Sequence, residues 1–305
     1  MTAGLAVIVV NYGSHELLID NLADIDFVAL GARCVIVDNF TSVGELAAVQ
    51  SLARRHGWDV VASPTNVGFG EGVNLGVAYA SDRGTDTFLL LNPDVKISVQ
   101  AIRTLRDRVQ AHPMDLVSPR ILNAHGGVWF AGGELDVSSG RVRTSRDVPM
   151  DAPFSWLTGA CLTVSRSLWT ATGGFDPEYF LYWEDVDFSQ RAKAAGGRLV
   201  VLKDVEVTHD VGATQGVGKS TVYLRFNARN RLLFASKWLP KHVQRRWIRR
   251  TPLESYRVLV RDGRRTLFQG KKVAAVVAGS AAGARAIVGP GSQNPNAVAI
   301  GAGSQ

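Results

Sequence analysis

Three acidic side chains lie within four positions of the sequence, directly after a run of aromatic and aliphatic residues. They are Glu184, Asp185 and Asp187, in the segment YFLYWEDVDFSQR at 179–191. Crowded carboxylates beside apolar side chains repel one another and lose solvation, and both effects raise a carboxyl pKa. Such a carboxylate can serve as a general base near neutral pH. The alternative is an acidic helix start, which the helix dipole favours.

Polar side chains also follow several apolar runs in the first half of the sequence. Asn11 and Tyr12 follow LAVIVV, Asp38 follows RCVIV, and Asn92 and Asp94 follow TFLLL. A divalent cation that bridges a diphosphate needs only one or two protein carboxylates, because phosphate oxygens and waters complete its shell. Asp94 is therefore a candidate metal ligand, and Asp38 a candidate hydrogen-bond acceptor for a nucleobase or ribose. Ordinary turns are the alternative for both, and a helix N-cap is a further one for Asp38.

Two further segments hold residues that could belong to a site. His209, in EVEVTHDVG, follows a strand-like run and is a candidate third metal ligand, with a purely structural role as the alternative. The segment NVGFGEGVNLG at 66–76 contains four glycines. A dinucleotide-binding fingerprint would place such glycines after the first strand, whereas these follow the third. This spacing argues against an NAD-dependent oxidoreductase.

The elements that would position these residues alternate between strands and helices. Near-continuous β-branched runs predict buried strands at 5–11, 33–39, 59–63, 87–94 and 115–119. Helical stretches such as HELLIDNLA and VGELAAVQSLARRHG separate them. Such alternation predicts an open, mostly parallel α/β sheet, in which ligands bind beyond the carboxyl ends of the strands. After about residue 120 we expect antiparallel pieces, then a helix near 184, a strand at 198–202 and a helix over 220–238.

Composition and charge describe an ordinary globular chain with one unusual segment. Hydrophobic residues make up 46% of it and charged residues 20%, and we find neither a signal peptide nor a membrane-spanning run. Cys34 and Cys161 lie in apolar segments and are expected to be reduced core residues of a cytosolic protein. The net charge is +7, and the segment 237–272 has twelve Lys or Arg against two acids. The Gly/Ser/Asn-rich end is expected to be disordered.

Seven motifs occur in a fixed order: VIVVNYGS, VIVDNFTS, NVGFGEGVNLG, LLLNPDV, WLTGACLTVSR, GGFDPEYFLYWEDVDFSQR and VTHDVG. Together they resemble the inverting family 2 glycosyltransferases of the GT-A fold, especially the bacterial rhamnosyltransferase-like branch. The resemblance covers roughly residues 4 to 236. It implies an α/β fold with a Rossmann-like open mixed sheet flanked by helices. We therefore expect a GT-A domain at 1–236, a basic helical C-terminal extension at 237–290 and a disordered tail at 291–305.

The resemblance also implies roles for individual residues. Asp185 matches the family's catalytic base, Glu184 would orient the acceptor, and Asp187 would only cap or solvate the helix. Asp94 would bind Mg²⁺ or Mn²⁺ at the donor diphosphate, with His209 as a further ligand. Asn92 stands where many members have the first Asp of a D-x-D motif, which leaves one acid fewer. The nucleotide site would contain Asn11, Tyr12, Asp38, Asn66, Gly68, Asn74 and Asn92, and the sugar and acceptor site Trp156, Gly159 and Trp183.

The implied activity is transfer of a sugar from a nucleotide-diphosphate donor to a glycan or a polyprenyl- or other lipid-linked acceptor in cell-envelope synthesis. dTDP-rhamnose is the first choice of donor and a UDP-sugar the second. The alternative from another class is a non-catalytic nucleotide-binding scaffold. A homodimer is a further candidate assembly.

The basic segment has its own set of interpretations. KHVQRRWIRR interleaves Trp247 and Ile248 among cations, so we interpret 237–272 as a docking segment for an anionic membrane surface. This would place a cytoplasmic enzyme peripherally on the inner face of the plasma membrane. A solvated helical surface is the plainer alternative. Nucleic-acid binding is not expected, because no groove-reading or aromatic-rich motif accompanies the cations.

Overall fold

The computed structural model of the chain describes residues 4–145, 154–210, 219–261 and 263–288. The chain divides into two compact units. The first comprises residues 1–134, 144–180 and 184–214, and the second comprises 135–143, 181–183 and 215–305. The short segment 181–183 of the second unit therefore directly precedes the acidic cluster. No helix within the described ranges combines the length and hydropathy that crossing a bilayer requires.

The first unit is built around a nine-stranded mixed sheet with the order β3-β2-β1-β4-β10-β6-β11-β5, and β7 pairs with β6 beside this path. Strands β1 to β4 are parallel to one another, whereas β10 runs antiparallel to β4 and β6. The strands are β1 (Gly4–Asn11), β2 (Ala32–Asp38), β3 (Asp59–Ala62), β4 (Thr85–Leu91), β5 (Val95–Lys96), β6 (Asp115–Asn123), β7 (Val128–Phe130), β10 (Cys161–Ser165) and β11 (Arg198–His209). A separate hairpin contains β8 (Gly133–Asp136) and β9 (Arg141–Thr144).

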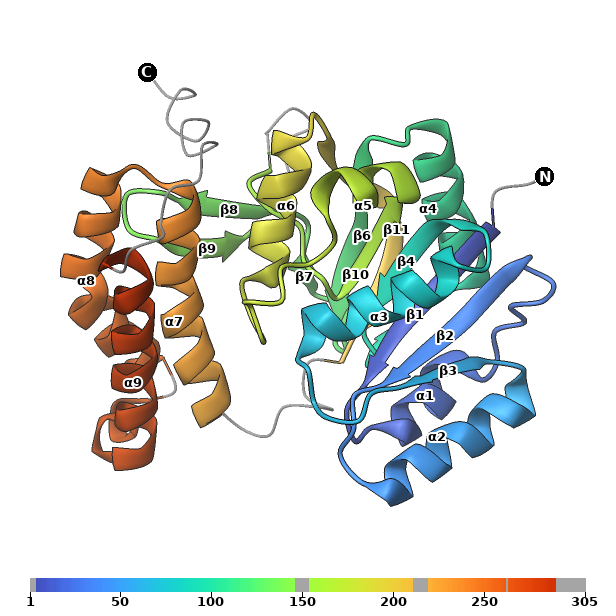
Figure 1. Ribbon diagram of the computed structural model, residues 1–305, viewed down its shortest axis with the longest axis horizontal. Coiled ribbons are helices and arrows are strands. Elements are labelled where there is room, and N and C mark those ends of the chain that lie inside the picture. The colour runs from blue at the N-terminus through green and yellow to red at the C-terminus, as the bar shows by residue number, and fades with distance from the viewer. Residues whose placement is uncertain (1–3, 146–153, 211–218, 262, 289–305) are drawn as a thin grey trace. The chain divides into compact units, whose positions relative to one another are not determined.

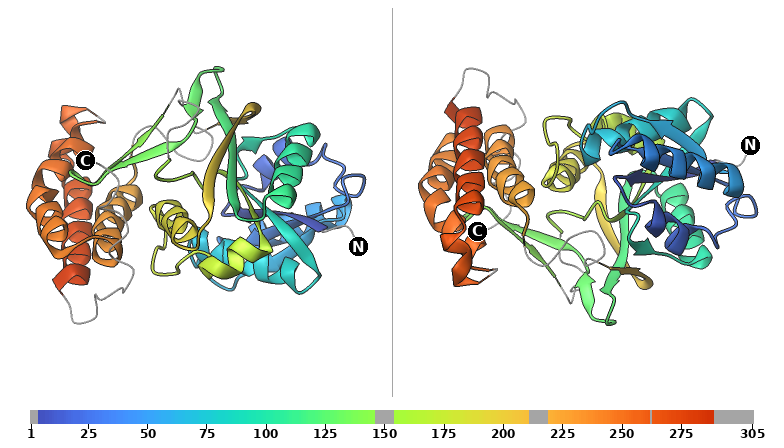
Figure 2. Two further views of the ribbon diagram at one scale, coloured as in Figure 1. Left: turned by 90° about the horizontal axis from the view of Figure 1, so that it is seen from above. Right: turned by 90° about the horizontal axis from the view of Figure 1, so that it is seen from below.

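Helices cover both faces of the large sheet, as Figures 1 and 2 show. On one face lie α1 (His15–Leu22), α2 (Val43–His56) and α4 (Val99–Ala111), and on the other α3 (Phe69–Ser81), α5 (Arg166–Thr172) and α6 (Glu184–Ala194). Serine caps start several of them; Ser98 Oγ, for example, accepts the Ala101 N–H at 3.1 Å. A Cβ at Gly76 in α3 would overlap the side chain of Ile8, so glycine lets α3 pack closely on β1.

The strands are buried as their near-continuous apolar sequences predicted. In β1, Val7 and Val9 are fully buried, and so are Phe88 and Leu89 in β4. Cys34 and Cys161 are buried free cysteines, in agreement with the reduced core residues that we expected. The α/β prediction is confirmed, and the antiparallel strands β5, β7 and β10 make the sheet mixed.

The second unit contains α7 (Thr221–Trp238), α8 (Lys241–Val260), the 3-10 helix η1 (Arg264–Phe268) and α9 (Gly270–Val288). Figure 1 shows α7, α8 and α9 side by side. A cluster of Leu224, Leu259 and Val276 lies between these helices. The helix predicted from about 220 to 238 is confirmed as α7 and begins after the N-cap Ser220.

Trp247 of α8 corrects one part of the membrane interpretation. Its side chain is 0% exposed, its Nε1 donates to the Val137 carbonyl at 2.7 Å, and its ring stacks on Phe234 with centroids 6.4 Å apart. We expected Trp247 to face a membrane among the cations, and this expectation was wrong. The periodicity of α8 turns the indole inward while its arginine neighbours remain exposed.

Candidate active site

The carboxyl ends of β1 and β2 place Asn11 and Asp38 side by side. The parallel register pairs the two residues directly, and both side chains are fully buried. Asn11 Nδ2 donates to Asp38 Oδ1 at 3.2 Å, while Asp38 Oδ2 is buried without a hydrogen-bond partner in the described part of the chain. Burial raises the pKa of Asp38, although the bond from Asn11 opposes this. An orphaned acceptor suits an N–H or O–H of a ligand. Tyr12, the next residue, is exposed.

Glu45 belongs to the same corner and was missed by the sequence prediction. It stands three residues after the N-cap Ser42, where an S-x-x-E pattern predicts a capping box. Its carboxylate instead accepts Asn11 Nδ2 at 2.8 Å and the His15 N–H at 2.9 Å. Burial alone would raise the pKa of Glu45, but these hydrogen bonds outweigh it and lower the pKa. The Glu45 carboxylate thus fixes the position of the Asn11 side-chain amide, which donates to Asp38.

Asn66 and Gly68 lie in the turn before α3, and this turn is tied to the end of β2. Asn39 Nδ2 donates to Asn66 Oδ1 at 3.0 Å and to the Gly68 carbonyl at 3.1 Å. Gly68 has φ +88°, and a Cβ there would overlap the Phe180 carbonyl oxygen. Only glycine readily adopts this φ and also leaves room for the Phe180 carbonyl oxygen. The sequence shows Asn39 as a polar residue at the end of this strand but does not reveal its contact with the loop, because nothing in an Asp-Asn pair says which of the two binds it.

Asn74 of α3 holds the segment that leads toward the acidic cluster. Its Nδ2 donates to the Phe175 carbonyl at 2.8 Å and to Glu71 Oε2 at 2.8 Å, and its Oδ1 accepts the Phe175 N–H at 2.9 Å. These bonds pin the backbone at Phe175 to α3. The nucleotide contact of Asn74 stays a prediction.

The antiparallel pairing of β10 with β4 brings the loop before β10 to the same edge of the sheet. Asn92, just after β4, donates its N–H to the Ala160 carbonyl at 2.9 Å. The neighbouring Gly159 donates its N–H to Asp185 Oδ2 at 3.2 Å. Trp156 is buried, and its Nε1 has no hydrogen-bond partner among the described residues. The structure therefore brings together the end of β4, the loop at Gly159 and the start of α6.

Glu184 and Asp185 differ in how their carboxylates are stabilised. Asp185 accepts hydrogen bonds from Gly159 N–H and, at 2.8 Å, from Val186 N–H. Glu184 Oε2 is buried, and the described residues offer it no partner. Burial raises the pKa of Asp185 to about 6 against the effect of its backbone hydrogen bonds. Burial, and then the charge of Asp185, raise the pKa of Glu184 well above its usual range. Of the two carboxyls, Glu184 therefore holds its proton to the higher pH and Asp185 ionises first.

Asp187, the third acid of the cluster, is buried inside the fold. Its side chain is 1% exposed, and its Oδ2 accepts a hydrogen bond from Arg191 Nε at 2.8 Å. We expected Asp187 to cap the helix or to be solvated, and its burial shows that solvation was wrong. The arginine one turn later neutralises the carboxylate. Arg191 also donates to the Thr172 carbonyl at 2.7 Å, which ties α6 to the end of α5.

Asp94 and His209 meet because β5 pairs with β11. The register places Val95 opposite His209, and Asp94 Oδ1 lies 3.0 Å from His209 Nε2, with both side chains buried. His209 Nδ1 has no hydrogen-bond partner in the described ranges, which also contain no cluster of three or more His, Cys, Asp or Glu suited to a metal. A carboxylate and an imidazole suit Mn²⁺, and two protein ligands suffice where a diphosphate completes the shell. Asp94 and His209 therefore suit a divalent cation whose remaining ligands come from the diphosphate of a nucleotide-sugar.

The two residues before α6 have a left-handed backbone. Tyr182 has φ 67° and Trp183 φ 74°, a conformation that costs about 1–2 kcal/mol for each residue other than glycine. Within the second unit, Asn230 Nδ2 donates to the carbonyls of Leu181 at 2.9 Å and Tyr182 at 2.7 Å. These bonds stabilise the turn that leads into the carboxylate pair. No sequence pattern pointed to Asn230, because it lies 49 and 48 positions from Leu181 and Tyr182.

The fold and the clustered acids agree with a comparison of the sequence. Residues 3–231 match the family described as Glycosyltransferase like family 2. The chain belongs to this family. A hexosyltransferase of low-salt glycan biosynthesis from Haloferax volcanii is 28% identical over 257 residues, covering 80% of each chain. The N-acetylglucosaminyl-diphospho-decaprenol L-rhamnosyltransferase of Mycobacterium tuberculosis is 29% identical over 245 residues, covering 71% of this chain and 79% of the relative.

Solved structures show the same fold at low sequence identity. GalNAc-T7 with UDP, GalNAc and Mn²⁺ has a TM-score of 0.61 at 13% identity; the match covers 90% of this family 2 chain but 54% of GalNAc-T7, about half its length. Residues 1–349 of S. aureus TarS with UDP-GlcNAc have a TM-score of 0.55 at 16% identity, with 91% and 90% covered. The GT-A type of α/β fold that the motifs implied is confirmed.

Proposed function

We propose that this family 2 glycosyltransferase moves a sugar, with inversion, from a nucleotide-diphosphate donor to a lipid-linked acceptor. The observation that carries the proposal is the pair of carboxylates at the start of α6, where Asp185 accepts two backbone N–H groups and the buried Glu184 Oε2 has no partner among the described residues. dTDP-rhamnose is the first choice of donor because the relative from M. tuberculosis is named a rhamnosyltransferase. A UDP-sugar is the second choice. The name of the same relative supports a diphosphate-linked polyprenol as the acceptor.

The transfer is a single displacement. Asp185 takes the proton of an acceptor hydroxyl, and that oxygen forms the new bond to the anomeric carbon while the bond to the nucleoside diphosphate breaks. Attack from the face opposite the leaving group inverts the configuration. Burial and the charge of Asp185 raise the pKa of Glu184, so its carboxyl group can donate a hydrogen bond that orients the acceptor. Gly159 holds Asp185 in place through its backbone N–H.

Asp38, Asp94 and His209 serve the donor in this proposal. The free oxygen of Asp38 accepts a hydrogen bond from the nucleobase or ribose, and Asn11 orients that carboxylate. Asp94 and His209 would hold Mg²⁺ or Mn²⁺, which when bound supplies positive charge for the departing diphosphate. Asn92 would contribute an amide oxygen in place of a second acid.

We also propose peripheral attachment to an anionic membrane surface at the inner face of the plasma membrane. Five arginines of α8 are exposed: Arg245, Arg246, Arg249, Arg250 and Arg257. In place of the buried Trp247, the exposed apolar side chains of this region are Leu253, Tyr256 and Phe268, which are 45%, 48% and 88% exposed. Cations combined with apolar side chains are typical of segments that lie on anionic lipid.

Sugar transfer by the purified chain tests the proposal. Radiolabelled dTDP-rhamnose and a panel of UDP-sugars are incubated with a membrane lipid extract, with Mn²⁺ and with chelator. We expect label in the lipid fraction from one donor, in the presence of metal, and a product whose anomeric configuration by NMR is opposite to that of the donor. Tight donor binding without any transfer would favour a nucleotide-binding scaffold, and a product that retains the donor configuration would refute inversion.

A further inference from the structure

The second unit contains a cavity of about 320 Å³ with an unusual charge. This volume lies within the range of about 300–1,000 Å³ that is typical of small-molecule sites. The charged side chains of its lining are Arg141, Arg231, Arg257 and Arg261, against the single acid Glu254. The lining thus has three more cationic than anionic groups.

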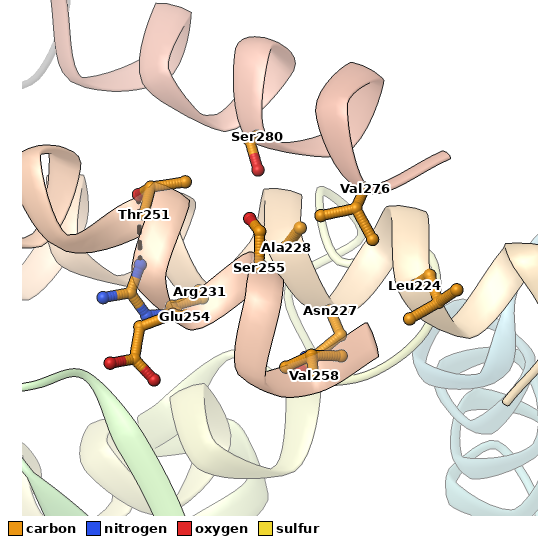
Figure 3. Close-up of a pocket in the computed structure, with 10 residues that line it drawn as sticks. All are labelled: Leu224, Asn227, Ala228, Arg231, Thr251, Glu254, Ser255, Val258, Val276 and Ser280. Atoms are coloured by element: carbon orange, nitrogen blue, oxygen red, sulfur yellow. Dashed lines mark hydrogen bonds between the residues drawn. The ribbon is translucent and has the colours of Figure 1, made fainter. Parts of the chain in front are cut away.

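One of these arginines is buried without a carboxylate of its own. Arg231 is 6% exposed, and its guanidinium donates to the carbonyls of Gly140 at 3.0 Å and Ser139 at 2.8 Å. It also donates to Thr251 Oγ1 at 3.4 Å, the bond that Figure 3 draws in the adjoining pocket. Burial lowers the pKa of Arg231 to about 10, although Glu254 opposes this. All three acceptors are neutral, so an anion in the cavity would stabilise this charge.

The one carboxylate of the cavity lining, that of Glu254, already pairs with two of the arginines. Glu254 accepts two hydrogen bonds from Arg141, at 2.7 and 2.8 Å, and one from Arg257 at 2.9 Å. Arg261 is exposed and has no acidic partner among the described residues. Forked guanidinium groups are well matched to phosphate oxygens. The free hydrogen-bonding capacity of the cavity therefore favours a ligand with two or more negative charges.

The remaining wall is apolar and adjoins the base along the chain. Trp183, Tyr223 and Val258 line the cavity, and Trp183 Nε1 donates to Asn227 Oδ1 at 2.9 Å, which fixes the indole. Asp185 follows Trp183 by two residues, so their Cα atoms are at most about 7.6 Å apart.

We propose that this cavity binds the diphosphate of the lipid-linked acceptor. Arg257 and Arg261 contact the phosphate oxygens, and the apolar wall contacts the first carbons of the lipid. This assignment rests on the proposed function as a transferase. It also accounts for the excess of arginine, because an acceptor without phosphate would need only hydrogen-bonding groups.

Two double variants separate the cavity from general surface charge. Arg257→Gln with Arg261→Gln removes two arginines that line the cavity, and Arg245→Gln with Arg249→Gln removes two exposed arginines of α8 that do not line it. Kinetics are measured in neutral detergent with two acceptors, N-acetylglucosaminyl diphosphofarnesol and octyl N-acetylglucosaminide. Binding of inorganic diphosphate is measured separately by calorimetry, with the donor site saturated by nucleoside diphosphate and Mn²⁺.

The cavity variant should raise KM for the diphosphate acceptor about tenfold or more, the effect of losing charge-assisted hydrogen bonds. KM for the octyl glycoside and the affinity for the donor should not change, and the control variant should match the parent. Equal effects on both acceptors, or equal effects of the two variants, would overturn the proposal. If the parent transfers to neither acceptor, the proposed function fails, and calorimetry decides the cavity alone: diphosphate binding that is the same in parent and cavity variant would refute it.

Discussion

Replacing Asp185 by asparagine is expected to remove activity and, at neutral pH, to make the fold more stable. Asparagine has nearly the shape of the carboxylate but cannot take a proton. We therefore expect kcat to fall by about 10²–10⁴-fold, the usual contribution of a general base, with donor KM nearly unchanged. A gain in stability accompanies this loss because the ionised carboxylate is held in a desolvated position.

The size of the gain follows from the pKa of Asp185, which burial raises from 3.8 to about 6. Two pKa units at about 1.4 kcal/mol each make the ionised form roughly 3 kcal/mol unfavourable at pH 7. Asparagine can accept only one of the two backbone N–H groups that Asp185 accepts, a loss of about 1 kcal/mol. The net gain is therefore on the order of 1–2 kcal/mol in the free energy of unfolding.

The pH dependence has a definite sign. The folded state binds the Asp185 proton more tightly than the unfolded chain, so this proton contributes stability below pH 3.8 that is lost as the pH rises through about 6. The advantage of Asp185→Asn should be full above pH 7 and should fade toward pH 4. In the parent, kcat/KM should fall about tenfold from its plateau by pH 5, where roughly a tenth of the base is ionised.

Urea unfolding at pH 7.5 and 4.5, together with kinetics from pH 5 to 8, tests both effects. Glu184→Gln is a comparison variant that should keep activity within about tenfold, because glutamine keeps a hydrogen-bond donor that can orient the acceptor. Asp187→Asn should instead lose about 3 kcal/mol of stability, because it leaves Arg191, whose side chain is only 20% exposed, without its carboxylate. If Asp185→Asn lowers stability at pH 7.5, or shifts it equally at both pH values, the desolvation argument is refuted. If Asp185→Asn retains its turnover, the general base is a residue other than Asp185.

Three other substitutions test separate parts of the molecule. Asp94→Ala should abolish the metal-dependent part of donor binding in calorimetry; unchanged binding with and without Mn²⁺ would exclude Asp94 as a ligand. Asn230→Ala removes both hydrogen bonds to the strained turn before α6. It should lower kcat about tenfold or more while the affinity for the donor stays constant. If only the stability changes, the turn does not position the carboxylates. Replacing Arg245, Arg246 and Arg249 by Ser should release the chain from anionic vesicles, since each cation near such a surface contributes about 1 kcal/mol; sedimentation indifferent to the substitutions and to salt would refute membrane attachment.

The strands and the residues at their ends could be predicted from the sequence because both follow local rules. A buried parallel strand reads as an unbroken apolar run, and the first polar residue after it marks the edge where ligands bind. The rule located Asn11, Asp38 and Asp94 at this edge. The family motifs added the GT-A type of mixed sheet, whereas the position of β10, antiparallel beside β4, was not predicted.

The residues that support the site could not be found in this way. Glu45 contacts Asn11 from 34 positions away, and Asn230 contacts Leu181 from 49 positions away. Such contacts depend on where loops and helices pack, and no period or spacing in the sequence encodes them. The burial of Trp247 was missed for a different reason, because its neighbouring arginines were interpreted as a single surface without placing them around the helix.

The acidic cluster shows how much a helical projection could have added. Residues two apart on an α-helix point about 200° from each other, so Asp185 and Asp187 cannot face the same environment. Asp187 has an arginine four positions later, Arg191, whereas position 189, four after Asp185, is a serine. When one acid of a helix has an arginine four positions later and another has none, the paired acid is expected to form a structural ion pair within the fold. The unmatched acid then needs its stabilisation from outside the helix, and Gly159 N–H supplies it at 3.2 Å. A backbone donor stabilises the charge without neutralising it, which leaves Asp185 able to take a proton.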